Sequence, residues 1–308
     1  MQLTMKNAFI KPYCAVCLLD MALKYLRERT TDEAMIMEGM RRAVEILQRG
    51  FSGDALTFQL GTEIAWMISD FLGIDDLFEI VKRESNTVCE AMFPNLVDRY
   101  NSIEDFDAKL DFVLCAVVAG NIIDVSTPGH EFTLDAAELF KIIEEIHIAG
   151  FEIDDREQLK SLILDDTAAK VLIMLDNAGE IVFDKLLVML LKEHGKHITC
   201  MVKGKPISND VTRADAEAVG MDVLCDEILE TSGASIGYDV EQNDQDVIDK
   251  VNAMDLIIGK GQANLETLST FIEDIEARHI FIISRIKCTT IAAFQCAKIG
   301  QQIIRKIK

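Results

Sequence analysis

Apolar residues recur at helical spacing through the first hundred positions of the chain. In the stretch TTDEAMIMEGMRRAVEILQRG, one face of a predicted helix carries Met37, Met40, Val44 and Leu47. We expect this face to pack in a core. Thr30 and Glu33 have the spacing of a capping box, and Gly50 can end the helix. Similar amphipathic patterns predict further helices in residues 18–26, 56–71 and 77–92.

The pattern changes near residue 165, where short β-rich runs begin to alternate with helical stretches. The predicted strands are residues 171–175, 198–202, 222–224, 255–258 and 280–283. The predicted helices between and after them are residues 181–194, 213–219, 265–276 and 289–306. Strands and helices in alternation predict right-handed crossovers and a mostly parallel sheet covered on both faces. We therefore expect an α/β protein with a helical amino-terminal region and a Rossmann-like α/β/α sandwich.

The two regions have no low-complexity linker between them. We predict a helical domain in residues 1–110 and an α/β domain in residues 111–308, with a boundary somewhere between 110 and 165. Residues 110–148 are expected to pack the helical part onto the α/β part.

Charge narrows the range of partners. The chain has 31 Lys and Arg against 52 Asp and Glu, a formal net charge of −21. Such a chain repels phosphate backbones and anionic lipids, so neither nucleic acid nor a membrane surface is an expected partner. Solubility is the simplest interpretation of the acidity, and a small anion can still bind where cations are local. The oligomeric state is left open.

Cysteine usage and the amino terminus predict a cytoplasmic protein. Eight cysteines are scattered through a chain of 308 residues, which favours reduced thiols over a disulfide framework. The first residues lack the apolar core of a signal peptide, and the longest apolar run, residues 112–123, is too short to span a bilayer.

Polar side chains follow the predicted strands. In VLIMLDNAGE, the apolar run ends in Asp176 and Asn177, and Asp210 follows the next strand, 210 − 176 = 34 residues later. Ligands of open parallel sheets bind beyond the carboxyl ends of the strands. Two carboxylates and one amide oxygen form a ligand set that suits Mg²⁺ or Mn²⁺. Each pair taken alone is better explained by helix capping and turn formation, but their recurrence at successive strand ends favours a metal site.

The segment GKGQAN places Lys260 between two glycines ahead of a predicted helix. This arrangement can bring backbone amides and a positive charge to a phosphate, although a solvated turn is the simpler interpretation. It is not a P-loop, and no strand-to-helix turn has the glycine pattern of a dinucleotide site. In VVAGNIIDVS, Asn121 and Asp124 are three residues apart, and a buried hydrogen-bonding pair and a helix end both remain open.

Cys14 and Cys17 form a C-x-x-C pair without a second pair at zinc-finger spacing. Three interpretations remain open: a redox pair, half of a metal site shared with Cys288, and two packed thiols.

Several of these motifs occur in one order along the chain: CAVC, AGNIID, LDNAGE, GKPISNDVT, GKGQANLETL and KC. This combination resembles the metal-dependent damage-control phosphatases, in particular the cysteine-bearing archaeal and bacterial branch. The resemblance extends from Cys14 to Cys288. It implies a phosphatase that hydrolyses phosphate esters of small metabolites, such as sugar phosphates, with Mn²⁺, Co²⁺, Ni²⁺ or Mg²⁺.

The resemblance also implies roles for individual residues. Asp176, Asn177 and Asp210 would hold the metal, Lys260 would contact the substrate phosphate, and Asn121 and Asp124 would line the same pocket. Asp176 and Asp210 would thereby be catalytic, as would Lys260. Relatives often carry Asp-Pro-Tyr before a lysine and an asparagine, whereas this chain matches with Asp76, Lys82 and Asn86 only. That departure concerns the substrate contacts of the helical part and not the metal site.

Glu180 comes four residues after Asp176. It can orient a water at the metal, or interact with the helix dipole as a first-turn glutamate. The proton acceptor and the formation of a phospho-aspartate stay open.

Two other functional classes fit parts of the sequence. A Rossmann-like sheet also serves S-adenosylmethionine-dependent methyltransferases, but its first turn here has one glycine and two metal-type ligands. A non-catalytic sensor of metals or thiol chemistry, built around Cys14, Cys17 and Cys288, requires those thiols to meet in space.

Overall fold

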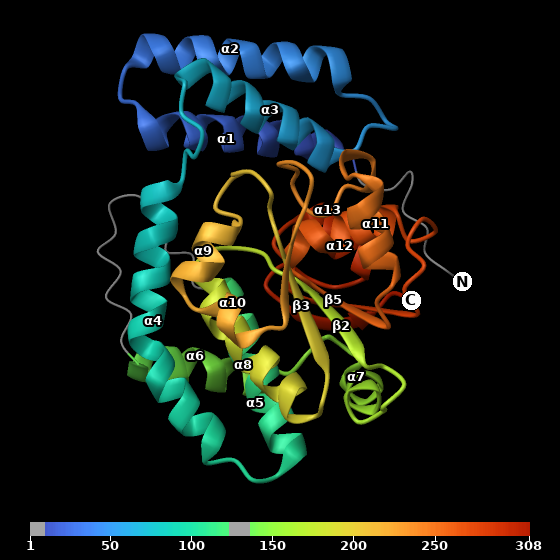
Figure 1. The fold of residues 1–308 in the computed structure, drawn as a ribbon. Helices are drawn as coiled ribbons and strands as arrows, with labels where there is room; N and C mark the ends of the chain where they lie inside the picture. Colours follow the sequence, from blue (N-terminus) through green and yellow to red (C-terminus); the bar gives the residue numbers. More distant parts are fainter. Residues whose placement is uncertain (1–9, 123–135) are drawn as a thin grey trace.

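The amino-terminal region is helical, as the apolar periodicity predicted (Figure 1). The computed structural model describes residues 10–122 and 136–308. Its first helices are α1 (Pro12–Arg29), α2 (Glu33–Gly50), α3 (Thr57–Leu72), α4 (Glu79–Asn101), α5 (Phe106–Ile122) and α6 (Ala136–Ala149). Helices α1–α3 form a layer with its own buried cluster, which includes Leu26, Ile64 and Ile68.

A seven-stranded sheet forms the rest of the core. Its strands are β1 (Ile153–Asp154), β2 (Lys170–Met174), β3 (His197–Val202), β4 (Glu227–Glu230), β5 (Leu256–Lys260), β6 (His279–Arg285) and β7 (Gln302–Lys306), in the spatial order β1-β7-β6-β5-β2-β3-β4. All neighbouring pairs are parallel except β6 and β7. The remaining helices are α7 (Arg156–Ile163), α8 (Glu180–Glu193), α9 (Arg213–Ala218), α10 (Met221–Leu224), the 3₁₀ turn η1 (Val240–Gln242), α11 (Gln245–Asn252), α12 (Gly261–Thr270) and α13 (Thr289–Gln295).

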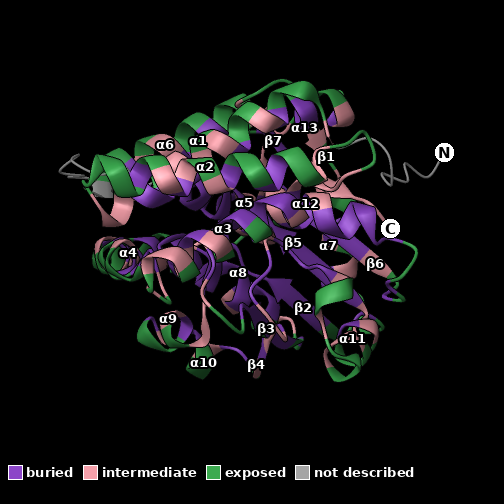
Figure 2. Cartoon of the chain, turned by 90° about the horizontal axis from the view of Figure 1, so that it is seen from above, coloured by how far each residue is buried: buried purple, intermediate pink, exposed green. Residues whose placement is uncertain are grey.

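Both faces of the sheet are covered, so the strands are nearly continuous apolar runs. Val171 and Ile173 of β2 pack on one face with residues of α4, α5, α6 and α8. Leu172 and Met174 point to the other face, where α11–α13 pack together with Phe58 of α3. Helices α5 and α8 and the central strands are the most deeply buried elements (Figure 2). The predicted α/β/α sandwich is confirmed.

The prediction of which α2 residues face the core is wrong in part. Its buried residues are Ile36, Gly39, Ala43, Ile46 and Leu47, whereas Met37 and Val44 are 71% and 49% exposed. The side chain of Leu26 packs so closely on Gly39 that a Cβ there would lie 2.5 Å from its Cδ2. Small residues let α1 approach on that side, which turns Met37 outward. The helix is capped by Asp32, whose side chain accepts hydrogen bonds from the backbone of Ala34 and Met35, and Thr30 does not fill this role.

Two further predictions are corrected in the carboxy-terminal half. The predicted strand at residues 222–224 is helix α10, and strand β4 follows it. The helix predicted over residues 289–306 is shorter in the structure, where α13 ends at Gln295. Cys296 then adopts a left-handed backbone conformation with φ 53°, and Gly300 has φ 90°. The chain then enters β7, where Ile303 and Ile304 are buried. Backbone pairing with β6 and β1 favours the strand over a helix of similar apolar content.

Helix α4 extends from the α1–α3 layer along the side of the sheet (Figure 1). Helix α5, in the segment expected to join the two parts, packs on α8. The division into residues 1–110 and 111–308 stays a prediction.

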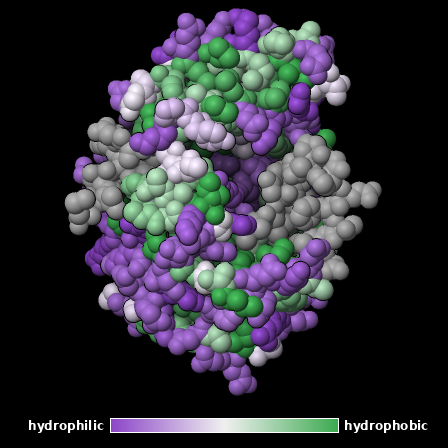
Figure 3. Space-filling model, turned by 180° about the vertical axis from the view of Figure 1, so that it is seen from behind, coloured by the Kyte–Doolittle hydropathy of each residue, from purple (hydrophilic) through white to green (hydrophobic). Residues whose placement is uncertain are grey.

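In the part of the chain that the structure describes, no helix has the length and apolarity needed to cross a membrane. From behind, the surface is hollowed below the α1–α3 layer, and hydrophilic residues line the hollow (Figure 3).

Candidate active site

The turn that follows β2 pairs with the loop that follows β3. The backbone N–H of Val211 donates to the carbonyl of Asp176 at 3.0 Å, and that of Ala178 donates to the carbonyl of Asn209 at 2.9 Å. Asn177 and Asp210 form an isolated antiparallel bridge. Asp176, Asn177 and Asp210 therefore lie together at adjacent strand ends, as the strand pattern led us to expect.

Asp176 is the most constrained of these residues. Its carboxylate Oδ2 accepts a hydrogen bond from Asn121 Nδ2 at 3.2 Å, and it is 8% exposed. Gly261, the first residue of α12, approaches so closely that a Cβ would lie 1.8 Å from Asp176 Oδ2. Gly261 also has φ 75°, so both space and backbone conformation require glycine.

The electrostatic environment of the two aspartates is unfavourable for bare negative charge. Burial raises the pKa of Asp176 to about 8, and the charges of Glu180 and Asp210 contribute in the same direction. Burial also raises the pKa of Asp210, although the ammonium of Lys203 opposes this. Both carboxylates would be ionised more readily beside an added cation.

A second group of carboxylates surrounds Lys260. This lysine is fully buried, and its Nζ donates to Glu180 Oε1 at 2.7 Å and to Asp184 Oδ1 at 2.5 Å. Burial alone would lower the pKa of Lys260, but the two carboxylates outweigh it and hold the ammonium charged. The predicted contact of Lys260 with a phosphate stays a prediction, and its ammonium lies within an ion-pair network.

Asn121 connects the two groups. Its Nδ2 donates to Glu180 Oε2 at 2.7 Å as well as to Asp176. Glu180 therefore contacts Asn121 and Lys260 with its two oxygens, so the network holds its side chain in place. Asp124, the other residue predicted to line the pocket, lies outside the described residues.

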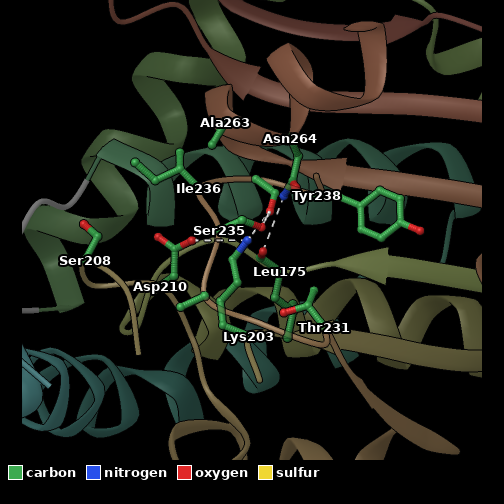
Figure 4. Close-up of polar contacts among 12 residues, drawn as sticks. Leu175, Lys203, Ser208, Asp210, Thr231, Ser235, Ile236, Tyr238, Ala263 and Asn264 are labelled. Carbon is green, nitrogen blue, oxygen red and sulfur yellow. Dashed lines mark hydrogen bonds and ion pairs between the residues drawn. The ribbon is translucent and has the colours of Figure 1, made fainter. Parts of the chain in front are cut away.

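Lys203 is a site residue that the sequence did not single out. It follows β3 directly, in the polar run KGKPISND, and its side chain is 7% exposed. Its Nζ donates to the carbonyl of Gly237 and lies 3.5 Å from Asp210 Oδ2. Figure 4 shows Lys203 pointing toward Asp210, with Ser208 beyond it and Ser235 nearby. The signal available in the sequence was position alone, because Lys203 and Lys205 both follow the strand.

Asn264 has a structural role in the segment GKGQAN. Its side-chain Nδ2 donates to the carbonyl of Lys260 at 2.8 Å and lies 3.3 Å from that of Met174. Figure 4 shows the same amide directed at Leu175, the residue after β2. Asn264 thereby ties the ends of β5 and β2 together beneath the turn that carries Asp176.

The residues that matched the family pattern in the helical part also have positioning contacts. Lys82 Nζ lies 2.7 Å from both Asp76 Oδ2 and Asp215 Oδ2. Asn86 Oδ1 accepts a hydrogen bond from the backbone N–H of Gly179 at 2.6 Å. Their described contacts hold α4 against α9 and against the turn after β2.

Comparison with known proteins assigns the chain to a family. A model of the damage-control phosphatase ARMT1-like domain matches residues 10–303. The chain belongs to this family. A damage-control phosphatase of Archaeoglobus fulgidus is 27% identical over 299 residues, which are 97% of this chain and 99% of that protein. Damage-control phosphatase PH1575 of Pyrococcus horikoshii is 27% identical over 282 residues, which are 91% of each chain.

A crystal structure shares the fold of this phosphatase over almost its whole length. It is that of a DUF89 family protein, PH1575 from Pyrococcus horikoshii, with a TM-score of 0.85, 24% identity and coverage of 97% of this chain and 99% of that one. The helical region and the mostly parallel sheet are therefore common to both. Family membership makes this protein a phosphoric monoester hydrolase, in a metal-dependent family that acts on phosphorylated substrates.

The sequence left three interpretations open for the thiols of Cys14, Cys17 and Cys288: a redox pair, a shared metal site and packed thiols. Cys14 Sγ is 3.7 Å from Thr290 Oγ1, two residues beyond Cys288. Burial raises the pKa of Cys17, and Cys288 and Cys14 contribute to the rise. Within the described residues, however, these three thiols do not form a set of metal-ligand atoms within 4.8 Å of one another. The sensor and the other interpretations of these thiols stay hypotheses.

Proposed function

We propose that this phosphatase hydrolyses phosphate monoesters of small metabolites, such as sugar phosphates, at a divalent-metal centre formed by Asp176, Asn177 and Asp210. The supporting observation is the pairing between the turn after β2 and the loop after β3, which holds these residues at adjacent strand ends. Two carboxylates and one amide oxygen are donors for a hard divalent cation. We therefore retain Mn²⁺, Co²⁺, Ni²⁺ and Mg²⁺ as candidates.

The surroundings of these residues fit a cation. Burial and mutual repulsion disfavour the ionised forms of Asp176 and Asp210, and a bound cation would offset both. Asn121 Oδ1 is a further buried oxygen for which the described residues provide no hydrogen-bond partner. When bound, a divalent cation polarises a phosphoryl oxygen and lowers the pKa of the attacking water.

Lys203 is our candidate for binding the substrate phosphate. An ammonium group has three N–H donors, and its contacts with Gly237 and Asp210 account for two among the described residues. The third can donate to a phosphoryl oxygen and stabilise the charge of the transferred group. Lys260 remains a second candidate for this contact, but only if its ammonium turns away from Glu180 or Asp184.

Glu180 is proposed to orient the attacking water. It is the first residue of α8, four residues after Asp176, and Lys260 and Asn121 hold its two oxygens. A carboxylate held in this way can accept a hydrogen bond from water without reorganising during the reaction. Asp124 is retained as a predicted pocket residue.

The test is a screen of phosphate release from a panel of phosphomonoesters, with each metal added to chelator-treated protein. Wild type is compared with Asp176→Ala and Asp210→Ala, and Asp222→Ala, which changes an exposed aspartate, is the matched control. We expect metal-restored release in wild type and Asp222→Ala, and loss of both turnover and metal binding in the other variants. Release by Asp210→Ala at the wild-type rate would remove that residue from the site. If the wild type releases no phosphate from any ester with any metal, the proposed reaction is contradicted.

A further inference from the structure

A second group of metal-ligating side chains lies away from the candidate active site. Asp111 and Cys115 are four residues apart on α5 and so share one face of that helix. His147 comes from α6, which packs against α5. One ligand atom from each of the three residues lies within 4.8 Å of the other two. Nothing in the proposed phosphatase reaction uses these residues.

A neighbouring arginine orients the aspartate. Arg156, at the start of α7, contacts Asp111 Oδ1 and also makes an ion pair with Asp154 at 2.6 Å. The other oxygen of Asp111, Oδ2, lies 2.5 Å from His147 Nδ1. A hydrogen bond from outside the ligand set commonly fixes the orientation of a metal-binding carboxylate. Residues of α6 and α7, 36 and 45 positions after Asp111 in the chain, thus hold the Asp111 side chain.

The cluster opens onto a cavity of about 550 Å³. Asp111, Cys115 and His147 all line this cavity, together with Phe112, Phe140 and Ile143. The acidic residues Glu104, Asp105 and Glu144 lie on the same walls and outnumber the one arginine there, Arg99, so the lining favours cations. An ion can reach the cluster from this side, although Cys115 itself is only 1% exposed.

We propose that Asp111, Cys115 and His147 bind a divalent transition metal ion of the zinc class. One sulfur, one imidazole nitrogen and one carboxylate oxygen are the donors that Zn²⁺ takes in proteins, and thiolate ligands discriminate against Mg²⁺. Three protein ligands would leave one position of a four-coordinate site for a water molecule. This site therefore selects a different metal from the oxygen-only centre at Asp176 and Asp210.

The competing interpretation is an ion-pair network without a metal. Arg156, Asp111 and His147 alone can form such a network at a half-exposed position, and Cys115 is then only a packed thiol. The two interpretations differ in whether Cys115 and His147 bind the same ion. A spectroscopic test of sulfur ligation separates them.

Bound metal would cross-link α5 to α6. Asn121, which donates to Asp176, is on the same helix, 121 − 115 = 6 residues after Cys115. At a rise of 1.5 Å per residue this corresponds to about 9 Å along the helix axis. The site is thus placed to hold the helix that supplies a residue to the candidate active site.

The experiment is a titration of the reduced, chelator-treated full chain with Co²⁺, a spectroscopic substitute for Zn²⁺. We expect a thiolate-to-cobalt charge-transfer absorption that Cys115→Ser abolishes and that excess Zn²⁺ removes. His147→Ala should weaken cobalt binding about a hundredfold or more, because even partners outside the ligand set change metal affinity by 10–100-fold. The side chain of His147 is 57% exposed, so this variant tests the site even if Cys115→Ser fails to fold.

Two controls assign the absorption to this cluster. Cys17→Ser changes an exposed cysteine elsewhere, and Asp210→Ala changes the oxygen-only centre; both should retain the absorption at wild-type affinity. Absence of the absorption in wild type would overturn the proposal, as would its persistence at wild-type affinity in His147→Ala. Neither result would alter the phosphate-release test, which depends on Asp176 and Asp210.

Discussion

Asn86 Oδ1 accepts a hydrogen bond from the backbone N–H of Gly179 at 2.6 Å. Asn86 belongs to α4, and Gly179 is in the turn that carries Asp176 and Asn177, where it adopts φ 82°. The nearest atom to a Cβ at Gly179 would be Ser85 Cβ, at 3.0 Å, so α4 packs directly on this turn. A helix of the amino-terminal region thus holds the backbone that presents two candidate metal ligands.

We expect Asn86→Ala to reduce both stability and activity. It removes the acceptor of the Gly179 N–H in a buried position, at a cost of about 1–3 kcal/mol in the free energy of unfolding. Relaxation of the turn should also weaken metal binding and lower kcat. Urea unfolding, metal titration and phosphate release would be measured beside Asn101→Ala, which changes an exposed asparagine at the end of the same helix. Equal metal affinity in both variants would show that the turn does not need Asn86.

Gly261→Ala should abolish metal-dependent turnover. The new Cβ would meet Asp176 Oδ2 at 1.8 Å, so the carboxylate or α12 must move. Gly220→Ala is a matched control, because Gly220 has φ 68° and a Cβ added there would meet no atom of the described residues within 4 Å. It carries the same backbone strain, about 1–2 kcal/mol, without the clash. The expected result is a larger loss of stability in Gly261→Ala than in Gly220→Ala, with activity lost only in Gly261→Ala. Full activity in Gly261→Ala would contradict the close approach.

Lys203→Met should lower kcat/KM about a hundredfold or more, the size expected when one donor to a developing negative charge is removed. Methionine keeps the approximate length of the side chain but loses the charge beside Asp210. Lys205→Met changes the exposed lysine of the same loop and should retain wild-type kinetics. The measurement is steady-state phosphate release with the best ester from the screen. If the two variants behave alike, Lys203 does not bind phosphate.

The stability of chelator-treated protein should fall as the pH rises from about 4 toward about 8. Burial raises the pKa of Asp176 to about 8 and that of Asp184 to about 7, whereas the ordinary value is 3.8. Between these values the folded state keeps protons that the unfolded chain has released, so the free energy of unfolding decreases with pH. Saturating metal should remove most of the fall, because it favours the ionised form of Asp176.

Urea unfolding at about pH 5 and about pH 8, with and without Mn²⁺, checks this prediction. In Asp176→Asn the dependence on pH should be shallower, since one of the buried carboxyl groups with a raised pKa no longer titrates. An unchanged unfolding free energy across this range in the chelated wild type would mean that Asp176 is already ionised without a metal.

Much of this architecture could be predicted from local patterns in the sequence. The strands β2, β3, β5 and β6 lie within two residues of their predicted bounds, because each is a short apolar run followed by polar residues. Their order with the helices predicted the parallel sheet. That topology brings strand ends together, so the proximity of Asp176, Asn177 and Asp210 followed from the sequence without any knowledge of contacts.

Other features depended on partners distant in sequence. The face of α2 that is buried was decided by the close packing of Leu26 on Gly39, and not by the most apolar stripe. Residues 302–306 form a strand because β6 and β1 provide hydrogen-bonding partners on both sides. Apolar content alone was compatible with a helix there.

The same distinction applies to the site. The chain order and residue types determined the α/β fold, the helical amino-terminal region and the positions of the candidate oxygen ligands at the strand ends. Only the tertiary structure decided that Lys260 is buried between Glu180 and Asp184, that Lys203 lies beside Asp210, and that Asn86 holds Gly179. Periodicity reports which residues avoid water along one element, whereas the partner of a buried charge or a backbone N–H is set by elements brought together from elsewhere in the chain.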